Sequence, residues 1–267
     1  MDKNSKLAEY VSSAQDLETF LNYKAVHHTY YKWYSTKAIV DYDLEQSAIF
    51  LSNGTRWNDI DDRDAFNSVA DKKRFGLCLS NSKSESVAMW MLYGGMGRAG
   101  VMIDFKRDML VELKNLSSLE LGVFENDAFK TLQTIKAYEY SIKLQDVLYV
   151  AKEDDGYYTI KKQDETVKNV DEAVISDYKG ITKKFPWNYE NECRLIVEVD
   201  EAIIIPVAKD ATHIKLVINE MKEKLKGRIY HAPNYDASIG YVYSKSNLKG
   251  SIDWDLCSSC ERKIDKG

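Results

Sequence analysis

The segment FPWNYENECRLIVEV, residues 185–199, places the strongest constraint on the fold of this chain. Pro186 excludes a regular helix through this point, because proline has no backbone N–H to donate. The apolar run after Arg194 is short and contains β-branched residues, so a strand is expected there. Side chains alternate between the two faces of a strand, and Glu190, Glu192 and Arg194 are therefore expected on one face.

The two carboxylates in this segment have a chemical consequence. Neighbouring carboxylates repel each other, and each raises the pKa of the other unless a cation or ligand hydroxyl groups satisfy them. The arrangement is typical of a site that binds a ligand. A solvated strand edge with a Glu–Arg ion pair is the alternative, because structural ion pairs are common.

The composition is that of a globular chain long enough to bury a core. The chain has 267 residues, of which 44% are hydrophobic and 30% are charged. Three prolines and 13 glycines leave no room for a long flexible linker. The net charge is −5, so nucleic acid would have to bind a local basic patch, for which Lys183, Lys184 and the run at 222–228 are candidates.

The N-terminal residues are charged and polar and lack the apolar run of a signal peptide. No run of about 18 apolar residues indicates a membrane span. We therefore expect a cytoplasmic protein with reduced thiols that does not contact a membrane. Cys257 and Cys260 are spaced like half of a zinc site, but two further ligands at suitable spacing are absent from the sequence.

The hydrophobic pattern predicts an α+β protein with a compact mixed sheet and flanking helices. A docking helix is expected in residues 1–28, a single domain at 29–250 with a charged loop or insertion around 150–172, and a tail at 251–267. The expected strands are 27–33, 48–52, 75–80, 100–105, 147–150, 202–207 and 229–232, and the expected helices are 36–44, 86–93, 129–135 and 213–226.

The sequence GMGRAG at 95–100 has the glycine spacing of a dinucleotide-binding loop. That loop needs a strand before the glycines and a helix after them, so that the helix N-terminus meets the pyrophosphate. Here a helical pattern precedes and a strand pattern follows. A turn between the two elements is the better interpretation.

Several short blocks occur in a distinctive order along the chain. They are YKWYS at 31–35, IFLSN at 49–53 with WND at 57–59, CLS at 78–80, MW at 89–90 with Tyr93, GV at 100–101 with Phe105, and Trp187, Glu190, Glu192 and Arg194. Together, over about residues 30–245, they resemble a bacterial family catalogued as domain of unknown function 2971. Many members of that family have proline after the Asn-Asp pair, whereas Ile60 follows here.

The layout of that family looks like the compact ADP-ribosyltransferase fold, which includes bacterial toxins that modify DNA and RNA. In that fold an early strand carries His, Arg or an aromatic residue, a middle strand carries Ser or Tyr, and a late strand carries the catalytic Glu, often as Glu-x-Glu. This step is an analogy of fold and motif order. It assigns 31–35 to the first element, Ser52 and Asn53 to the second, and Glu190 with Glu192 to the third.

The resemblance implies NAD as the substrate. Cleavage of the ribose–nicotinamide bond passes through an oxocarbenium-like state, which a nearby carboxylate stabilises. Glu192 is assigned that role, and Glu190 would orient or deprotonate the nucleophile. Tyr34 is a third catalytic candidate, and it could also stack on a ring of NAD. The implied NAD-binding residues are Tyr31, Lys32, Ser35, Ser52, Asn53, Trp90, Tyr93 and Arg194.

Simpler roles remain open for some of these residues. Trp90 and Tyr93 would equally suit core packing under the glycine-rich turn. Asn58 and Asp59 would equally suit a helix N-cap or a turn.

The leading hypothesis is an ADP-ribosyltransferase that consumes NAD, modifies a nucleic acid or protein, and acts as a toxin or anti-phage effector. Such an enzyme implies a neutralising antitoxin protein. One alternative is a metal-dependent nuclease in which Asp59, Glu190 and Glu192 hold a divalent ion and Arg194 steadies a phosphate. Another is a non-enzymatic protein-interaction module.

Overall fold

The computed structural model describes residues 28–236, except 58, 82–86, 163–164, 177 and 179. The helix expected near the N-terminus and the tail with Cys257 and Cys260 lie outside the described residues, as does Asn58.

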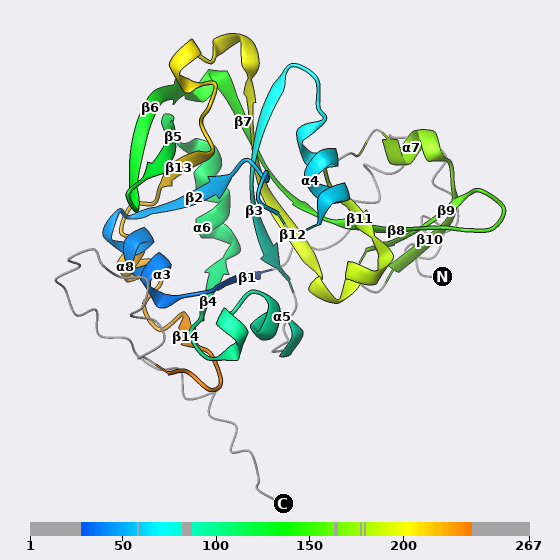
Figure 1. The fold of residues 1–267 in the computed structure, drawn as a ribbon, viewed down its shortest axis with the longest axis horizontal. Helices are drawn as coiled ribbons and strands as arrows, with labels where there is room; N and C mark the ends of the chain where they lie inside the picture. Colours follow the sequence, from blue (N-terminus) through cyan, green and yellow to red (C-terminus); the bar gives the residue numbers. More distant parts are fainter. Residues whose placement is uncertain are drawn as a thin grey trace, which may run out of the picture.

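A ten-stranded sheet forms the main body (Figure 1). Its order is β14-β4-β1-β3-β2-β13-β5-β6, with β12 pairing β3 and β7 off this path. Every pairing in this sheet is antiparallel, so the expectation of a mixed sheet is wrong for the main body. The strands are β1 (Thr29–Tyr34), β2 (Ala48–Ser52), β3 (Lys72–Ser80), β4 (Val101–Lys106), β5 (Ser118–Glu125), β6 (Ala128–Lys136), β7 (Tyr140–Asp146), β12 (Glu192–Asp200), β13 (His213–Val217) and β14 (Ile229–His231).

A second sheet has the order β10-β9-β8-β11 and extends to one side of the main sheet (Figure 1). Its strands are β8 (Leu148–Lys152), β9 (Tyr158–Lys162), β10 (Glu165–Val170) and β11 (Thr182–Lys184), and β11 runs parallel to β8. The charged stretch around 150–172, expected as a loop or insertion, therefore consists largely of strands. The physical reason is its apolar set, in which Ile160, Val167 and Val170 form a small core with Leu148 and Val174 of α7 (Glu172–Ser176).

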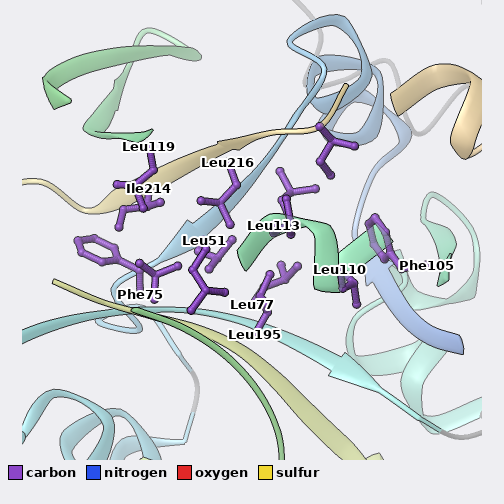
Figure 2. Packing of buried hydrophobic residues seen from close by; sticks show 14 of the residues in the cluster. Leu51, Phe75, Leu77, Phe105, Leu110, Leu113, Leu119, Leu195, Ile214 and Leu216 are labelled. Carbon is purple, nitrogen blue, oxygen red and sulfur yellow. The ribbon is translucent and has the colours of Figure 1, made fainter. Parts of the chain in front are cut away.

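One face of the main sheet is covered by α6 (Arg107–Glu112) and the 3₁₀ turn η2 (Leu113–Asn115). Figure 2 shows Leu110 and Leu113 from this segment among Leu51, Leu77 and Leu195 of the strands. These side chains belong to one large buried cluster. Burying each leucine contributes roughly 1.5–3 kcal/mol, so this layer holds the central strands together.

Three expected elements differ from the structure. Residues 129–135 lie in β6 rather than a helix, because Asn126 and Asp127, both at positive φ, turn the chain back onto β5. Residues 213–226 form β13 and the short helix α8 (Met221–Lys224), since Ile214 and Leu216 alternate as in a strand. Residues 202–207 are not a strand but fall in two 3₁₀ turns, η5 (Glu201–Ile203) and η6 (Pro206–Ala208).

Other expected elements are confirmed. The strands expected at 48–52, 75–80, 100–105 and 147–150 coincide with β2, β3, β4 and β8 to within a few residues. The helices expected at 36–44 and 86–93 are α3 (Lys37–Glu45) and α5 (Val87–Leu92).

The glycine-rich segment between α5 and β4 is a tight turn, as expected. Gly95 has φ +60°, and a Cβ there would lie 2.3 Å from the Ser35 carbonyl oxygen. The glycines permit close backbone packing against the end of β1.

The two edges of β3 are used unequally. Strand β12 pairs with β3 along its whole length, from Glu192↔Ser80 to Asp200↔Lys72. The other edge is shared by β1, through Tyr31↔Ser80, and by β2, through Ser52↔Gly76. Because each is paired at a single position, β1 and β2 diverge from β3, and the sheet opens where they separate.

Candidate functional site

Five charged side chains from four elements meet at the end of β12. They are Asp62 of α4 (Ile60–Asn67), Lys183 of β11, Glu190 of the 3₁₀ helix η4 (Phe185–Glu190), and Glu192 and Arg194 of β12. We call them the ionic cluster. All five are buried. Buried charges need partners, so their mutual contacts decide whether the arrangement is tolerable.

Arg194 fixes two carboxylates at once. Its Nε lies 2.7 Å from Glu192 Oε1, and its Nη1 and Nη2 lie 2.8 and 2.6 Å from the two oxygens of Asp62. Nη1 also donates to the Gly180 carbonyl at 2.7 Å, and the guanidinium lies 4.8 Å from the centre of the Trp57 ring. Arg194 is therefore fully bound within the protein.

Lys183 lies between the two glutamates. Its Nζ is 2.5 Å from Glu190 Oε2 and 3.1 Å from Glu192 Oε2, and the ammonium lies 4.9 Å from the centre of the Trp187 ring. The expectation that Lys183 belongs to a surface patch is wrong, because on β11 its side chain points inward. Lys184, the next residue, points outward and pairs with Asp61.

Glu190 does not lie on the strand, contrary to expectation. It ends η4, and Asn191 then adopts a left-handed conformation with φ +42°. This turn lets the carboxylates of Glu190 and Glu192 converge on Lys183 from different backbone directions. Tyr93 Oη donates to Glu190 Oε1 at 2.5 Å, and Ser80 Oγ donates to the Glu190 carbonyl at 2.6 Å.

The two glutamates have pKa values shifted in opposite directions. Burial raises the pKa of Glu190, and the opposing effect of Lys183 does not cancel this rise. Burial would also raise the pKa of Glu192, but Arg194 and Lys183 outweigh it and hold that pKa below its usual value. Carboxyl pairs whose pKa values are shifted apart in this way are typical of acid–base sites, where one group stays ionised and the other exchanges a proton.

The ionic cluster also carries unequal charge. Three carboxylates face two cations, which leaves one net negative charge when all are ionised. A buried negative charge of this kind stabilises positive charge that develops nearby.

One cavity lies against the ionic cluster, and a second, larger cavity adjoins the first. The smaller cavity, of about 360 Å³, is lined by Asp62, Lys183, Glu190 and Glu192 together with residues of β1, β3 and α5. The larger cavity, of about 870 Å³, occupies the opening between β1, β2 and β3 under α3. Lys32, Trp57 and Cys78 line both cavities, so they form a shared wall.

The structure brings together most of the residues proposed from the sequence. Those in the smaller cavity are Tyr31, Lys32, Tyr93, Glu190 and Glu192, and those in the larger cavity are Lys32, Tyr34, Ser35 and Ser52.

Three of the proposed residues line neither cavity. Trp90 is buried against Trp33, with ring centres 6.3 Å apart, in agreement with the packing alternative. Asn53 caps its own turn by accepting from the N–H and hydroxyl of Thr55. Arg194 is fully buried, which leaves it no exposed face for a phosphate.

Tyr34 is held by a buried acid. Its hydroxyl is hydrogen-bonded to Asp43 of α3, and burial together with Asp43 raises the Tyr34 pKa well above the usual value. Burial also raises the pKa of Asp43, against the lowering effects of Tyr34 and Lys32. The Tyr34 hydroxyl therefore keeps its proton at neutral pH, which suits hydrogen bonding rather than service as a base.

The residues suggested for a divalent ion are engaged otherwise. Asp59 caps α4, accepting from the N–H groups of Asp61 and Asp62 at 3.1 and 3.3 Å, so the N-cap alternative is confirmed. The Lys183 ammonium lies between Glu190 and Glu192, in the position that a divalent metal ion would need. Across the described ranges, no group of three or more His, Cys, Asp or Glu side chains is arranged to hold a metal ion.

Sequence reasoning missed four contributors to the site. Tyr149 of β8 accepts from the Glu192 N–H at 2.7 Å, and the Cys78 thiol is hydrogen-bonded to Glu192. Asp62 and Trp57 complete the surroundings of Arg194. No local pattern reveals these contacts, although the requirement that a buried arginine be paired predicts a carboxylate of some kind.

None of the helices within the described ranges combines the length and apolar character needed to cross a membrane.

Comparisons with known proteins bear on the segment that carries the site. No curated protein and no solved structure matches the chain. A family model described as "Protein of unknown function (DUF2971)" matches residues 89–195, a range that contains Tyr93, Glu190, Glu192 and Arg194. The chain is therefore similar to that family over the segment that supplies the paired glutamates, in support of the resemblance predicted from its sequence.

Proposed function

We propose that this protein is an ADP-ribosyltransferase that moves ADP-ribose from NAD to a macromolecular acceptor. One observation carries the proposal. Two buried glutamates with opposite pKa shifts line a cavity, and the cluster around them has an excess of negative charge.

Glu192 is the group that stabilises the transition state. The bond between the ribose anomeric carbon and the nicotinamide nitrogen breaks with both electrons going to nitrogen, so nicotinamide leaves as a neutral molecule. The ribose becomes oxocarbenium-like and positive. Arg194 and Lys183 keep Glu192 ionised, so its charge is in place before the bond breaks and needs no reorganisation.

Glu190 is the group that takes the proton of the incoming nucleophile. A raised pKa makes its carboxylate a stronger base than an ordinary glutamate. The nucleophile forms the new bond to the anomeric carbon, and its proton passes to Glu190. Tyr93 and Lys183 orient the Glu190 carboxylate from two sides.

The acceptor is a nucleic acid or a protein, and the cellular role is that of a toxin or anti-phage effector. An enzyme that consumes NAD and modifies macromolecules harms its own cell unless it is restrained. A neutralising antitoxin protein is therefore part of the proposal.

The test uses NAD labelled in its ADP-ribose part. The pure protein is incubated with this NAD and, in turn, with RNA, DNA and cell lysate, and both nicotinamide release and label transfer are measured. Glu192→Gln removes the proposed stabilising charge at constant size, and we expect it to lower the rate about 10²–10³-fold.

Glu198→Gln is the matched control. Glu198 lies on the same strand and is paired with Arg74 and Lys143, but it lines neither cavity. Equal loss in both variants, or no nicotinamide release by the parent protein, would overturn the proposal. Cleavage of the added RNA or DNA that disappears with chelator would favour the metal-dependent nuclease, and nicotinamide release without transfer would indicate NAD hydrolysis.

A further inference from the structure

Building on the proposed function, we propose that the larger cavity binds the adenosine half of NAD, with Lys32 at the pyrophosphate between the two cavities.

The volumes of the two cavities suit a ligand that occupies both. Small-molecule sites commonly enclose about 300–1,000 Å³. The smaller cavity, at about 360 Å³, lies at the lower end of that range, while the larger, at about 870 Å³, lies near the upper end. A dinucleotide with its nicotinamide riboside beside Glu192 would extend past the shared wall into the larger cavity.

The larger cavity is lined by aromatic rings suited to a planar base. Tyr42, Phe50, Trp57, Phe124 and His213 all line it. The Phe124 ring lies 5.1 Å from that of Phe50 and 4.9 Å from that of His213, so these side chains form one surface. Every nucleobase has a π-face that stacks on such a surface.

Lys32 supplies the charge that a pyrophosphate needs. Its ammonium lies 5.8 Å from the centre of the Tyr34 ring, and it forms no ion pair or hydrogen bond with other residues in the part of the chain that the structure describes. Of the other cations nearby, Lys183 and Arg194 are held by carboxylates, and Arg56 lines the smaller cavity but not the larger. Lys32 therefore remains available to a ligand anion where the two cavities meet.

Other polar groups that line the larger cavity match a base rather than a second anion. Asp43 and Asp127 line it, and its other polar groups include the side chains of Ser35 and Ser52. Carboxyl and hydroxyl groups accept hydrogen bonds from an exocyclic amine, whereas a carboxylate would repel a phosphate. We therefore place the adenine end of NAD in this cavity and the phosphates at Lys32.

The test separates binding from catalysis. ADP binding is measured by calorimetry, and nicotinamide release is measured with NAD and with nicotinamide mononucleotide, which lacks the adenosine half. Phe124→Leu should weaken ADP binding and raise the KM for NAD about 10-fold, which lies within the range of base–aromatic stacking energies. The KM for nicotinamide mononucleotide should stay within about twofold. Lys32→Gln should weaken the binding of ADP more than it weakens the binding of adenosine, when both are measured by calorimetry.

Phe129→Leu is the control, since Phe129 packs on Phe50 and Phe124 but does not line the cavity. It should leave ADP binding unchanged. A parent protein that does not bind ADP would overturn the inference. So would a Phe124→Leu variant that loses only label transfer, because the cavity would then belong to the acceptor. ADP binding by a parent protein that releases no nicotinamide would support the nucleotide cavity and refute the proposed NAD cleavage.

Discussion

Arg194 binds both carboxylate oxygens of Asp62 across 132 positions of sequence, with N–O distances of 2.8 and 2.6 Å. This fork ties α4 to β12. It also leaves Nε for Glu192, so a single guanidinium orients the strand carboxylate and anchors the helix.

Replacing Arg194 should be costly for stability. Arg194→Met leaves Asp62 and Glu192 buried without their guanidinium partner, and we expect the free energy of unfolding to fall by about 3–5 kcal/mol. Urea unfolding measures the loss. Arg63→Met is the control, because the Arg63–Asp64 pair is more exposed and should contribute less than about 1 kcal/mol. Similar losses of unfolding free energy in both variants would show that the Arg194–Asp62 pair does not hold α4 against β12.

The two glutamates should give stability opposite dependences on pH. The Glu192 pKa is lowered on folding from its usual 4.5, so its contribution is full above that pH and is lost as the pH falls through the folded-state value. The Glu190 pKa is raised, so the folded protein binds the proton more tightly, and its contribution declines as the pH rises above 4.5.

Unfolding free energies of the parent, Glu192→Gln and Glu190→Gln, measured from about pH 2.5 to pH 7, check this prediction. The stability difference between parent and Glu192→Gln should shrink toward low pH. The difference for Glu190→Gln should change in the opposite sense, and parallel curves would refute the assignment.

Tyr93 should tune the acidity of Glu190. Its hydroxyl donates to Glu190 and lowers the pKa of that carboxyl, although burial keeps the pKa above its usual value. Tyr93→Phe removes this bond, so the pKa should rise further. If Glu190 is the base, the acidic limb of the pH profile for nicotinamide release should move to higher pH. Tyr189→Phe, beside Glu190 in sequence but outside the cavities, should leave the limb in place.

A comparison of two glycines, Gly95 in the turn before β4 and Gly227, separates the cost of a positive φ from the cost of steric crowding. Gly95 and Gly227 have similar positive φ values, +60° and +68°, but a Cβ on Gly227 would meet nothing within 4 Å. Gly227→Ala should therefore cost about 1–2 kcal/mol from conformation alone. Gly95→Ala should cost a further 1–3 kcal/mol, roughly, because its Cβ would overlap the Ser35 carbonyl. Equal losses of unfolding free energy for the two variants in urea would show that the backbone around Gly95 moves to accommodate the methyl group.

Local patterns predicted part of this fold well. The alternation after Pro186 correctly gave strand β12 and placed Glu192 and Arg194 on one face, because a strand's period of two is independent of distant contacts. The same alternation is wrong for Glu190, since the left-handed Asn191 breaks that period. Residues 129–135 were misassigned because a partner strand outweighed the local helical pattern.

The site was only partly predictable for a related reason. Glu190 and Glu192 could be proposed from their spacing, but their pKa values depend on Lys183, Arg194 and Tyr93. Asp62 comes from a helix that begins with the N-cap Asp59 and holds Asp61 and Asp62 in its first turn, with no local sign of which aspartate faces inward. Convergence of that kind is set by tertiary packing.

Lys183 and Tyr149 both come from the four-stranded sheet, and both bind Glu192. Trimming this sheet to obtain a minimal protein would therefore strip the paired glutamates of an ammonium and a phenol while leaving the main sheet's strands in place. Large-to-small substitutions in the small apolar core of this sheet, at Leu148, Ile160, Val167, Val170 or Val174, should therefore disturb the surroundings of Glu192. A region whose charged sequence suggests a dispensable decoration is thus a structural part of the site.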